Sequence, residues 1–236
     1  LGGSATVDGG AGLAQALGVR LLDDAGQELP HGGGALGRLA RIDVSGLEPD
    51  LSQVKILLAS DVTNPLTGEQ GAARVFGPQK GATSEMVALL DKNLSHFATV
   101  VKRDCGSSPA DVAGAGAAGG LGFGLLAFTT AEIHRGVDLV LHFTDFAHQV
   151  AGADFVFTGE GRIDFQTQFG KTPLGVSRMA RQVVPGVPVI ALAGSVGQGV
   201  VVLNNDFTAI FATPTGAKEL SQAVADAPDD IVQTAE

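Results

Sequence analysis

The chain contains four short apolar runs, and each is bounded by Gly, Pro or Asp. They cover residues 54–59, 154–158, 187–193 and 207–213. Their β-branched and aromatic residues are typical of strands buried inside a sheet. Helical periodicity fills the segments between them. Because strands that alternate with helices form parallel sheets covered by those helices, the sequence predicts an α/β fold.

The clearest helical pattern spans residues 83–103. Ser84 is a suitable N-cap, and Glu85 in the first turn complements the helix dipole. Apolar residues at helical spacing predict one buried face. They are Met86, Leu89, Leu90, Leu94, Phe97 and Val101.

The order of predicted elements changes near residue 150. From about residue 151 we predict a strand, a helix over 172–183, two further strands and a final helix from about residue 218. That order is typical of a flavodoxin-like parallel sheet. The preceding part is less regular, with a helix over 11–17 and a glycine turn at 32–34 that leads into another helix. We therefore expect two α/β lobes, residues 1–150 and 151–236.

Charge and composition exclude several functions. Lys and Arg number 15 against 25 Asp and Glu, a net charge of −10 that argues against binding nucleic acid or an anionic membrane. No apolar run reaches the roughly 18 residues that a membrane-spanning helix needs. Cys105, the one cysteine, cannot form an internal disulfide, so we expect a cytoplasmic location. The sequence lacks HExxH and Gly-x-Ser-x-Gly, which disfavours zinc catalysis and serine hydrolysis.

Glycine is concentrated in four segments. Residues 1–12, 68–81, 114–124 and 159–170 hold 18 of the 34 glycines. Segment 114–124 formally matches G-x-G-x-x-G, but no strand precedes it, which excludes a dinucleotide fingerprint. Gly116 and Gly119 then suit either a phosphate held by bare N–H groups or tight helix packing. Segment 170–172 resembles the end of a Walker A loop, which Phe165 excludes because it stands where the leading glycine belongs.

Polar residues follow each predicted strand, at the edge where parallel sheets bind ligands. Glu160, Arg162 and Asp164 stand at alternate positions, so an extended backbone would point all three the same way. Two carboxylates beside a guanidinium could hold Mg²⁺ together with an anionic substrate group. The alternative is a solvated turn with an internal ion pair.

Two further segments suit anions or metals. After the first predicted strand, Asp61 and Asn64 offer oxygen ligands or an acid/base carboxylate, or else form only an Asx-type turn. Arg74 and Lys80 place two cations near a glycine-hinged loop, just before the start of the 83–103 helix, where an anion could bind.

The opening segment has a similar composition. Ser4, Thr6 and Asp8 stand among glycines ahead of a helix, which suits an anion or a metal, although Asp8 could simply cap that helix. Phosphoryl transfer fits the whole set best, because it needs positioned phosphates, Mg²⁺ and one base rather than a strong protein nucleophile.

Four blocks of the sequence resemble, in order, those of the bacterial glycerate kinase family. They are GGSATVDGGAG (2–12), DVTNPLTGEQGAARVFGPQKGAT (61–83), GAGAAGGLGFG (114–124) and TGEGRIDFQTQFGKTPLGV (158–176). Val7 departs from the Asn expected in many relatives. Family members carry further segments at the amino end, such as APDSFKGS and DGGEGT, so we expect this chain to be a fragment that lacks them.

The resemblance implies one flavodoxin-like lobe and one lobe with a restriction-endonuclease-like α/β fold. It also implies transfer of a phosphoryl group from ATP to D-glycerate, more often giving the 2-phosphate than the 3-phosphate. The implied partners are these small molecules and Mg²⁺, and the oligomeric state stays open. A different hypothesis is a nucleotide-binding or organic-acid-binding module without catalysis, or an inactive fragment.

Site roles follow from the resemblance together with the residue types. Arg162 and Lys80 would neutralise a carboxylate or a phosphate. Asp61, Glu160 and Asp164 would hold Mg²⁺ or deprotonate the attacking hydroxyl. Residues expected to contact substrate or phosphate are Ser4, Thr6, Asp8, Asn64, Gly116, Gly119 and Lys171.

Overall fold

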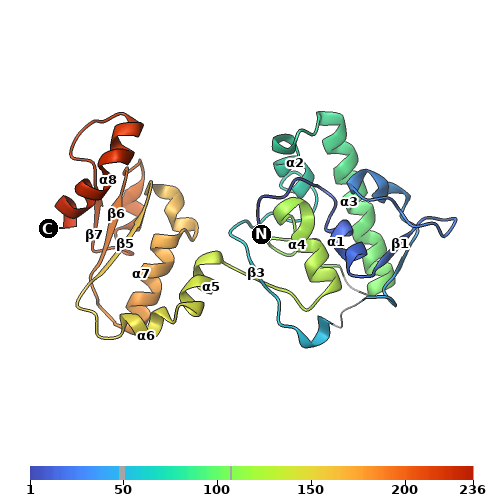
Figure 1. Cartoon of the computed structure of the whole chain (residues 1–236), viewed down its shortest axis with the longest axis horizontal. Coiled ribbons are helices and arrows are strands. Elements are labelled where there is room, and N and C mark those ends of the chain that lie inside the picture. Colours follow the sequence, from blue (N-terminus) through green and yellow to red (C-terminus); the bar gives the residue numbers. More distant parts are fainter. Residues whose placement is uncertain (48–50, 107, 236) are drawn as a thin grey trace. The chain divides into compact units, whose positions relative to one another are not determined.

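The computed structural model describes residues 1–47, 51–106 and 108–235. The chain forms two compact units, Leu1–His134 and Arg135–Glu236 (Figure 1). The boundary lies earlier than the residue 150 expected from the sequence, because α5 (Gly136–Phe143) and α6 (Phe146–Val150) pack against α7 (Thr172–Val183) in the second unit. Both units combine helices with parallel strand pairs, which confirms the α/β class.

The first unit combines helices with two small sheets. Strands β1 and β2 pair antiparallel, whereas β3 and β4 pair parallel. Its elements are α1 (Ala11–Ala16), β1 (Arg20–Leu22), β2 (Arg41–Asp43), β3 (Leu57–Ala59), α2 (Ala72–Phe76), α3 (Ser84–Cys105), α4 (Ala117–Phe128) and β4 (Glu132–His134), with 3₁₀ helices at Gly33–Arg38, Leu51–Gln53 and Pro78–Lys80. Only the last three residues of the apolar run 54–59 form a strand. The restriction-endonuclease-like assignment stays a prediction.

Helix α3 forms the centre of the first core. Phe97 is fully buried, lies edge-on to Phe123 with 5.4 Å between ring centroids, and stacks on Phe128 at 6.3 Å. Both partner rings belong to α4, so the two helices are joined by aromatic packing. Among the described residues, no helix has both the length and the apolar character needed to cross a bilayer.

The sequence-based description of α3 needs two corrections. The N-cap is Thr83 rather than Ser84, since its Oγ1 accepts the N–H of Met86 at 3.3 Å. Met86 and Leu89 are about half exposed, at 53% and 52%, although we expected them to be buried. Leu90, which the pattern placed on the buried face, and Val87 pack against the core, whereas Met86 and Leu89 lie outside the covered side of the helix. The expected burial of Leu94, Phe97 and Val101 is correct.

The second unit is built on a parallel three-stranded sheet in the order β5-β6-β7. Its strands are β5 (Val156–Glu160), β6 (Val189–Ala193) and β7 (Ala209–Ala212), its last helix is α8 (Leu220–Ala235), and its 3₁₀ helices are Phe165–Phe169 and Val200–Leu203. The parallel arrangement agrees with the expectation for residues 151–236, and the flavodoxin-like assignment stays a prediction.

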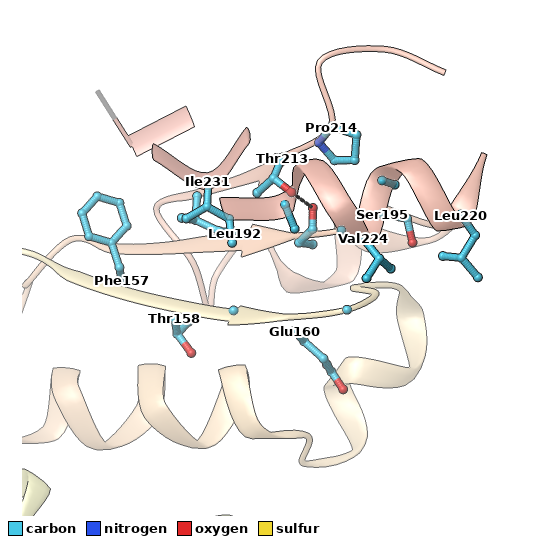
Figure 2. A pocket seen from close by; sticks show the side chains of 16 residues that line it. Phe157, Thr158, Glu160, Leu192, Ser195, Thr213, Pro214, Leu220, Val224 and Ile231 are labelled. Carbon is cyan, nitrogen blue, oxygen red and sulfur yellow. Dashed lines mark hydrogen bonds between the residues drawn. The ribbon is translucent and has the colours of Figure 1, made fainter. Parts of the chain in front are cut away.

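The two faces of this sheet differ. Val156, Val189 and Ala191 are buried in the core that also includes Ala180 of α7. Because side chains alternate along a strand and partners in register share a face, Phe157 and Leu192 lie on the opposite face. Figure 2 shows α8 above that face. Pro228 lies inside α8.

Glycines in the first unit allow main chains to touch directly. A Cβ atom added to Gly120 would lie 2.7 Å from the Cα of Gly9, and one added to Gly124 would lie 2.8 Å from the Cα of Gly10. Real Cβ atoms do not approach other carbons so closely. The beginning of α4 therefore packs against the loop before α1 without intervening side chains.

Gly122→Ala tests this packing inside α4. Alanine favours a helix over glycine by about 1 kcal/mol, but a Cβ atom here would lie 2.4 Å from the Gly114 carbonyl oxygen. We expect the variant to lose about 1–3 kcal/mol of stability through overpacking. Thermal and urea unfolding followed by circular dichroism measure the change.

Gly34→Ala is the matched control, because an added Cβ at Gly34 meets nothing within 4 Å. If Gly122→Ala were as stable as the wild type, the contact between the 114–116 loop and α4 would not be tight.

Candidate active site

Lys80 and Ser4 meet in the first unit, although 76 positions separate them in the sequence. The Lys80 Nζ donates hydrogen bonds to Ser4 Oγ at 2.7 Å and to the Thr6 carbonyl at 2.6 Å. Lys80 ends the 3₁₀ helix Pro78–Lys80, and Gly81 follows in the left-handed conformation that turns the chain toward α3. Burial lowers the pKa of the Lys80 ammonium, while the charge of Asp8 opposes that shift.

A small cavity of about 210 Å³ lies beside Lys80. Its lining residues are Leu1, Gly2, Gly3, Ser4, Val62, Phe76, Gln79, Lys80 and Ala118. Ala118 has φ of 54°, one of two left-handed non-glycine residues in the described chain. Such strain persists only where the surroundings enforce it, and it is concentrated at functional sites. Ala118 could not be identified from the sequence, because an alanine is ordinary at the start of a glycine-rich helix.

Gly119 lies close to both Thr6 and Lys80. A Cβ atom on Gly119 would lie 2.0 Å from the Thr6 carbonyl oxygen and 2.8 Å from the Lys80 Nζ. Only a glycine with φ of +75° fits here. The structure therefore shows the tight-packing role for Gly119, and phosphate binding by this residue stays a prediction.

Asp8 holds the start of α1. Its Oδ1 accepts the N–H of Gly10 and its Oδ2 accepts the N–H of Gly12, both at 3.1 Å. The side chain is largely buried, so these bonds satisfy main-chain donors that would otherwise lack a partner. This is the structural alternative that we weighed for Asp8, and contact with substrate remains a prediction.

The loop after β3 brings Asp61 and Asn64 to the same unit. Asn64 donates its side-chain N–H to the Gln70 carbonyl at 2.8 Å, and its own carbonyl accepts the Gly116 N–H at 2.8 Å. A Cβ atom on Gly116 would lie 2.2 Å from the Pro65 carbonyl oxygen, so this glycine also serves close packing. Asp61 is exposed, and Val62 beside it lines the Lys80 cavity.

The second unit gathers four charged residues at the end of β5. Arg162 Nε donates to Asp164 Oδ2 at 3.0 Å, and the Lys171 ammonium lies 3.7 Å from Glu160 Oε1. The N–H of Gln166, the Arg162 side chain and the charge of Lys171 all lower the pKa of Asp164. The internal ion pair that the alternative interpretation of this segment predicts is therefore present between Arg162 and Asp164, whereas Glu160 pairs with Lys171.

Asp164 also begins the 3₁₀ helix Phe165–Phe169. Its Oδ1 accepts the Gln166 N–H at 2.9 Å, and Thr167 Oγ1 accepts the Asp164 N–H at 3.3 Å. Both carboxylate oxygens of Asp164 thus have partners within the chain. Asp164 anchors the exposed guanidinium of Arg162, and its part in metal binding stays a prediction.

Glu160 is the carboxylate best suited to Mg²⁺ in this unit. Its Oε2 is buried and finds no hydrogen-bond donor among the described residues. Across residues 1–47, 51–106 and 108–235, no three His, Cys, Asp or Glu side chains gather as a metal cluster. Mg²⁺ often takes one or two protein carboxylates and completes its shell with phosphate oxygens and water. Glu160 fits that mode, and Asp61 belongs to the other unit.

A larger cavity of about 710 Å³ lies between α8 and the sheet (Figure 2). Its walls are mainly apolar, with Phe157 and Leu192 on the sheet and Leu220, Val224 and Ile231 on α8. Figure 2 shows the Glu160 side chain pointing to the other face of the sheet, toward α7. The sequence did not indicate this cavity, because its walls join strands to a helix far along the chain.

Comparisons with known proteins converge on one family. The family model for the glycerate kinase family matches residues 1–236. Glycerate kinase of Halalkalibacterium halodurans is 58% identical over 199 residues, which are 84% of this chain and 52% of that protein. Glycerate kinase of Bacillus subtilis is 52% identical over 236 residues, all of this chain and 61% of that protein.

A relative from Escherichia coli is named glycerate 2-kinase, and it is 47% identical over 98% of this chain and 60% of its own length. A crystal structure of a glycerate kinase 2 candidate from Salmonella typhimurium LT2 is similar with a TM-score of 0.83 and 46% identity. It covers 99% of this chain, which spans 60% of that one. The chain thus spans between 52% and 61% of the length of these proteins.

The lowered pKa of Asp164 predicts a specific acid sensitivity. Folding favours the ionised carboxylate of Asp164. Its contribution to the free energy of unfolding is therefore complete above the pKa of the unfolded chain, about 3.8, and is lost as the pH falls through the lower pKa of the folded protein. Asp164→Asn should be less stable than the wild type at pH 7, with the difference shrinking below about pH 4. Thermal unfolding across pH 2.5–7 is the measurement.

Asp154→Asn, at an exposed position of the same unit, is the matched control for the loss of one carboxylate. A stability gap for Asp164→Asn that stays constant down to pH 2.5 would contradict the assignment.

Proposed function

The chain belongs to the glycerate kinase family, and we propose that it transfers the γ-phosphoryl group of ATP to a hydroxyl of D-glycerate. The product is 2-phosphoglycerate, with 3-phosphoglycerate as the alternative. Support for the 2-position comes from the name of the Escherichia coli relative. We also propose a cytoplasmic location, in keeping with the single cysteine.

The observation that carries the proposal is the partly buried Lys80 ammonium beside strained Ala118. An ammonium has three N–H donors, and two are directed at Ser4 Oγ and the Thr6 carbonyl. We assign the third to an oxygen of an anionic substrate, the glycerate carboxylate or a phosphate. Because burial weakens competition from water, a charge-assisted hydrogen bond here is stronger than at an exposed site.

The second unit has a cation of its own that suits phosphate, Arg162. Arg162 Nε donates a hydrogen bond to Asp164, yet the Arg162 side chain is 65% exposed. Its terminal N–H groups could therefore bind two phosphate oxygens at once. Asp164 sets the direction of the guanidinium, and Lys171 adds charge beside it. Substrate orientation in phosphoryl transfer depends on such fixed cations more than on protein nucleophiles.

Glu160 would hold Mg²⁺ through its buried Oε2. When bound, Mg²⁺ would neutralise charge on the transferring phosphoryl group. The acceptor hydroxyl also needs a carboxylate that takes its proton, and we assign this role to Asp61. Its loop contributes Val62 to the cavity that contains Lys80, so the proposed base and the proposed anion site share one segment.

A coupled ADP-release assay tests the proposed reaction. The full-length protein with ATP, Mg²⁺ and D-glycerate should release ADP in proportion to glycerate, and chelation of Mg²⁺ should abolish the signal. Nuclear magnetic resonance of the phosphorylated product distinguishes the 2-phosphate from the 3-phosphate. ADP release that does not rise above the rate without glycerate would reject the function.

Lys80→Met should lower kcat/KM for glycerate by about 10–100-fold, which corresponds to the loss of one charge-assisted hydrogen bond of about 1.5–3 kcal/mol. The same assay measures it, with circular dichroism as the check on folding. Lys92→Met, at an exposed position of α3, is the matched control and should keep the wild-type rate. Equal kcat/KM values for Lys80→Met and the wild type would remove Lys80 from the site.

A further inference from the structure

Arg162 and Asp164 lie on a segment that continues the parallel pairing beyond the end of β5. Ile163 stands between them, is fully buried, and pairs in parallel with the loop after β6. The Ile163 N–H donates to the Ser195 carbonyl at 3.0 Å, and the Ile163 carbonyl accepts the Gly197 N–H at 2.8 Å. Main-chain bonds to the loop after β6 thus fix the backbone that carries the two charged side chains.

Gly197 lies directly beside the pair formed by Arg162 and Asp164. A Cβ atom added to Gly197 would lie 2.8 Å from the Asp164 Cβ, 3.1 Å from Arg162 Nη2 and 3.3 Å from Arg162 Nε. Real Cβ atoms do not come as close as the first of these distances, and the other two leave no room for a methyl group at an unchanged guanidinium. The Nε and Nη2 edge of the guanidinium therefore packs against bare main chain.

The need for a glycine at this position comes from space and not from backbone conformation. Gly197 does not have the left-handed φ that Gly199 adopts at 74°. An alanine could therefore take the main-chain conformation of Gly197, and its methyl group would displace a neighbouring side chain. The end of Arg162 moves most easily, because it is 65% exposed on a flexible stem, whereas Ile163 and Asp164 are buried.

We propose that Gly197 is a positioning residue for Arg162. Because residue 197 has no side chain, the guanidinium can lie against the main chain while its Nε donates to Asp164, and its terminal N–H groups keep one direction. Bidentate binding of an oxyanion depends on that direction, and a side chain held in place loses less entropy on binding. The inference deepens the proposed function and rests on it for the role of Arg162 as a phosphate ligand.

Nuclear magnetic resonance of the full-length protein, isotopically labelled at arginine, tests the fixed orientation without using activity. The Nε–H signal of Arg162, assigned as the one absent from Arg162→Ala, should exchange with water at least about tenfold more slowly than that of Arg178. The Arg178 side chain is 55% exposed, and its Nε lies 3.8 Å from Asp206 Oδ1, beyond hydrogen-bond distance. In Gly197→Ala, the Arg162 signal should shift and exchange about as fast as that of Arg178.

Gly216→Ala is the matched control. Gly216 belongs to the same unit, has no left-handed φ, and an added Cβ there meets nothing within 4 Å. This variant should keep the wild-type Arg162 signal. An unchanged Arg162 signal in folded Gly197→Ala would overturn the proposal.

A second variant decides the matter if Gly197→Ala does not fold. Arg162→Ala combined with Gly197→Ala removes the guanidinium that the new methyl group would meet. Recovery of a cooperative thermal transition in the double variant supports the proposal. Continued failure to fold overturns it, because the glycine would then serve only the contact with Asp164.

A double-mutant cycle separates the positioning of Arg162 from a general effect on the fold. In the ADP-release assay, Gly197→Ala should lower kcat/KM by about 10–100-fold, since a misplacement of about 1 Å has effects of this size. In the Arg162→Ala background, the same substitution should change kcat/KM by less than about twofold. Equal fold-losses in the two backgrounds would contradict the inference, because Gly197 would then act without Arg162.

The outcomes separate this inference from the proposed function. If the protein does not phosphorylate glycerate but Gly197→Ala frees the Arg162 signal, Gly197 orients Arg162 and the function is rejected. If the wild type phosphorylates glycerate and Gly197→Ala keeps both its kcat/KM and its Arg162 signal, the inference is overturned while the function stands.

Discussion

Direct contact between main chains is the constraint on which the first unit depends. The segments 2–12, 61–65 and 114–124 approach so closely that side chains cannot stand between them, as the contacts of Gly116 with Pro65 and of Gly119 with Thr6 show. This approach brings Ser4 next to Lys80 and leaves a small cavity beside the ammonium. The left-handed φ of Ala118 is a cost of the same packing, since L-residues disfavour that region by about 1–2 kcal/mol.

In the second unit, side chains alternate along β5, so its polar and apolar side chains lie on opposite faces of the sheet. Thr158 and Glu160 point toward α7, so the carboxylate meets Lys171 on that side. Phe157 points the other way and forms part of an apolar wall. Register therefore matters here, because a slip of one residue would exchange the charged and the apolar faces.

Several features could be predicted from the sequence because their signals are local. Residues 172–183 form the helix that their pattern predicts, and three of the four apolar runs supply the strands of the parallel sheet. Arg162 pairs with Asp164 two positions along the chain, as their spacing allowed, whereas no sequence signal indicated the approach of Lys80 to Ser4 across 76 positions. Whether these groups contact a substrate stays a prediction.

Other features could not be predicted, because they depend on tertiary packing. Strands of three residues, such as β1 and β4, are too short for a periodic signal. The exposure of Met86 depends on which side of α3 is covered by neighbouring segments. For Asp8 the sequence left helix capping and ligand contact open, and the structure shows the bonds to the start of α1. The unit boundary shifted because α5 and α6, which precede the first strand of the second sheet, pack with its helix α7.

Pro228 has a mechanical consequence for α8. Proline has no N–H, so the main-chain bond that would join residue 228 to the carbonyl of Val224 is missing. Anchors lie on both sides of this point, because Lys218 bonds Asp226 before it and Asp230 after it. Side chains that line the cavity also lie on both sides, with Val224 before Pro228 and Ile231 after it. The helix is therefore held at both halves but lacks one main-chain bond between them, so a bend at Pro228 would change the angle between the two parts of the apolar wall.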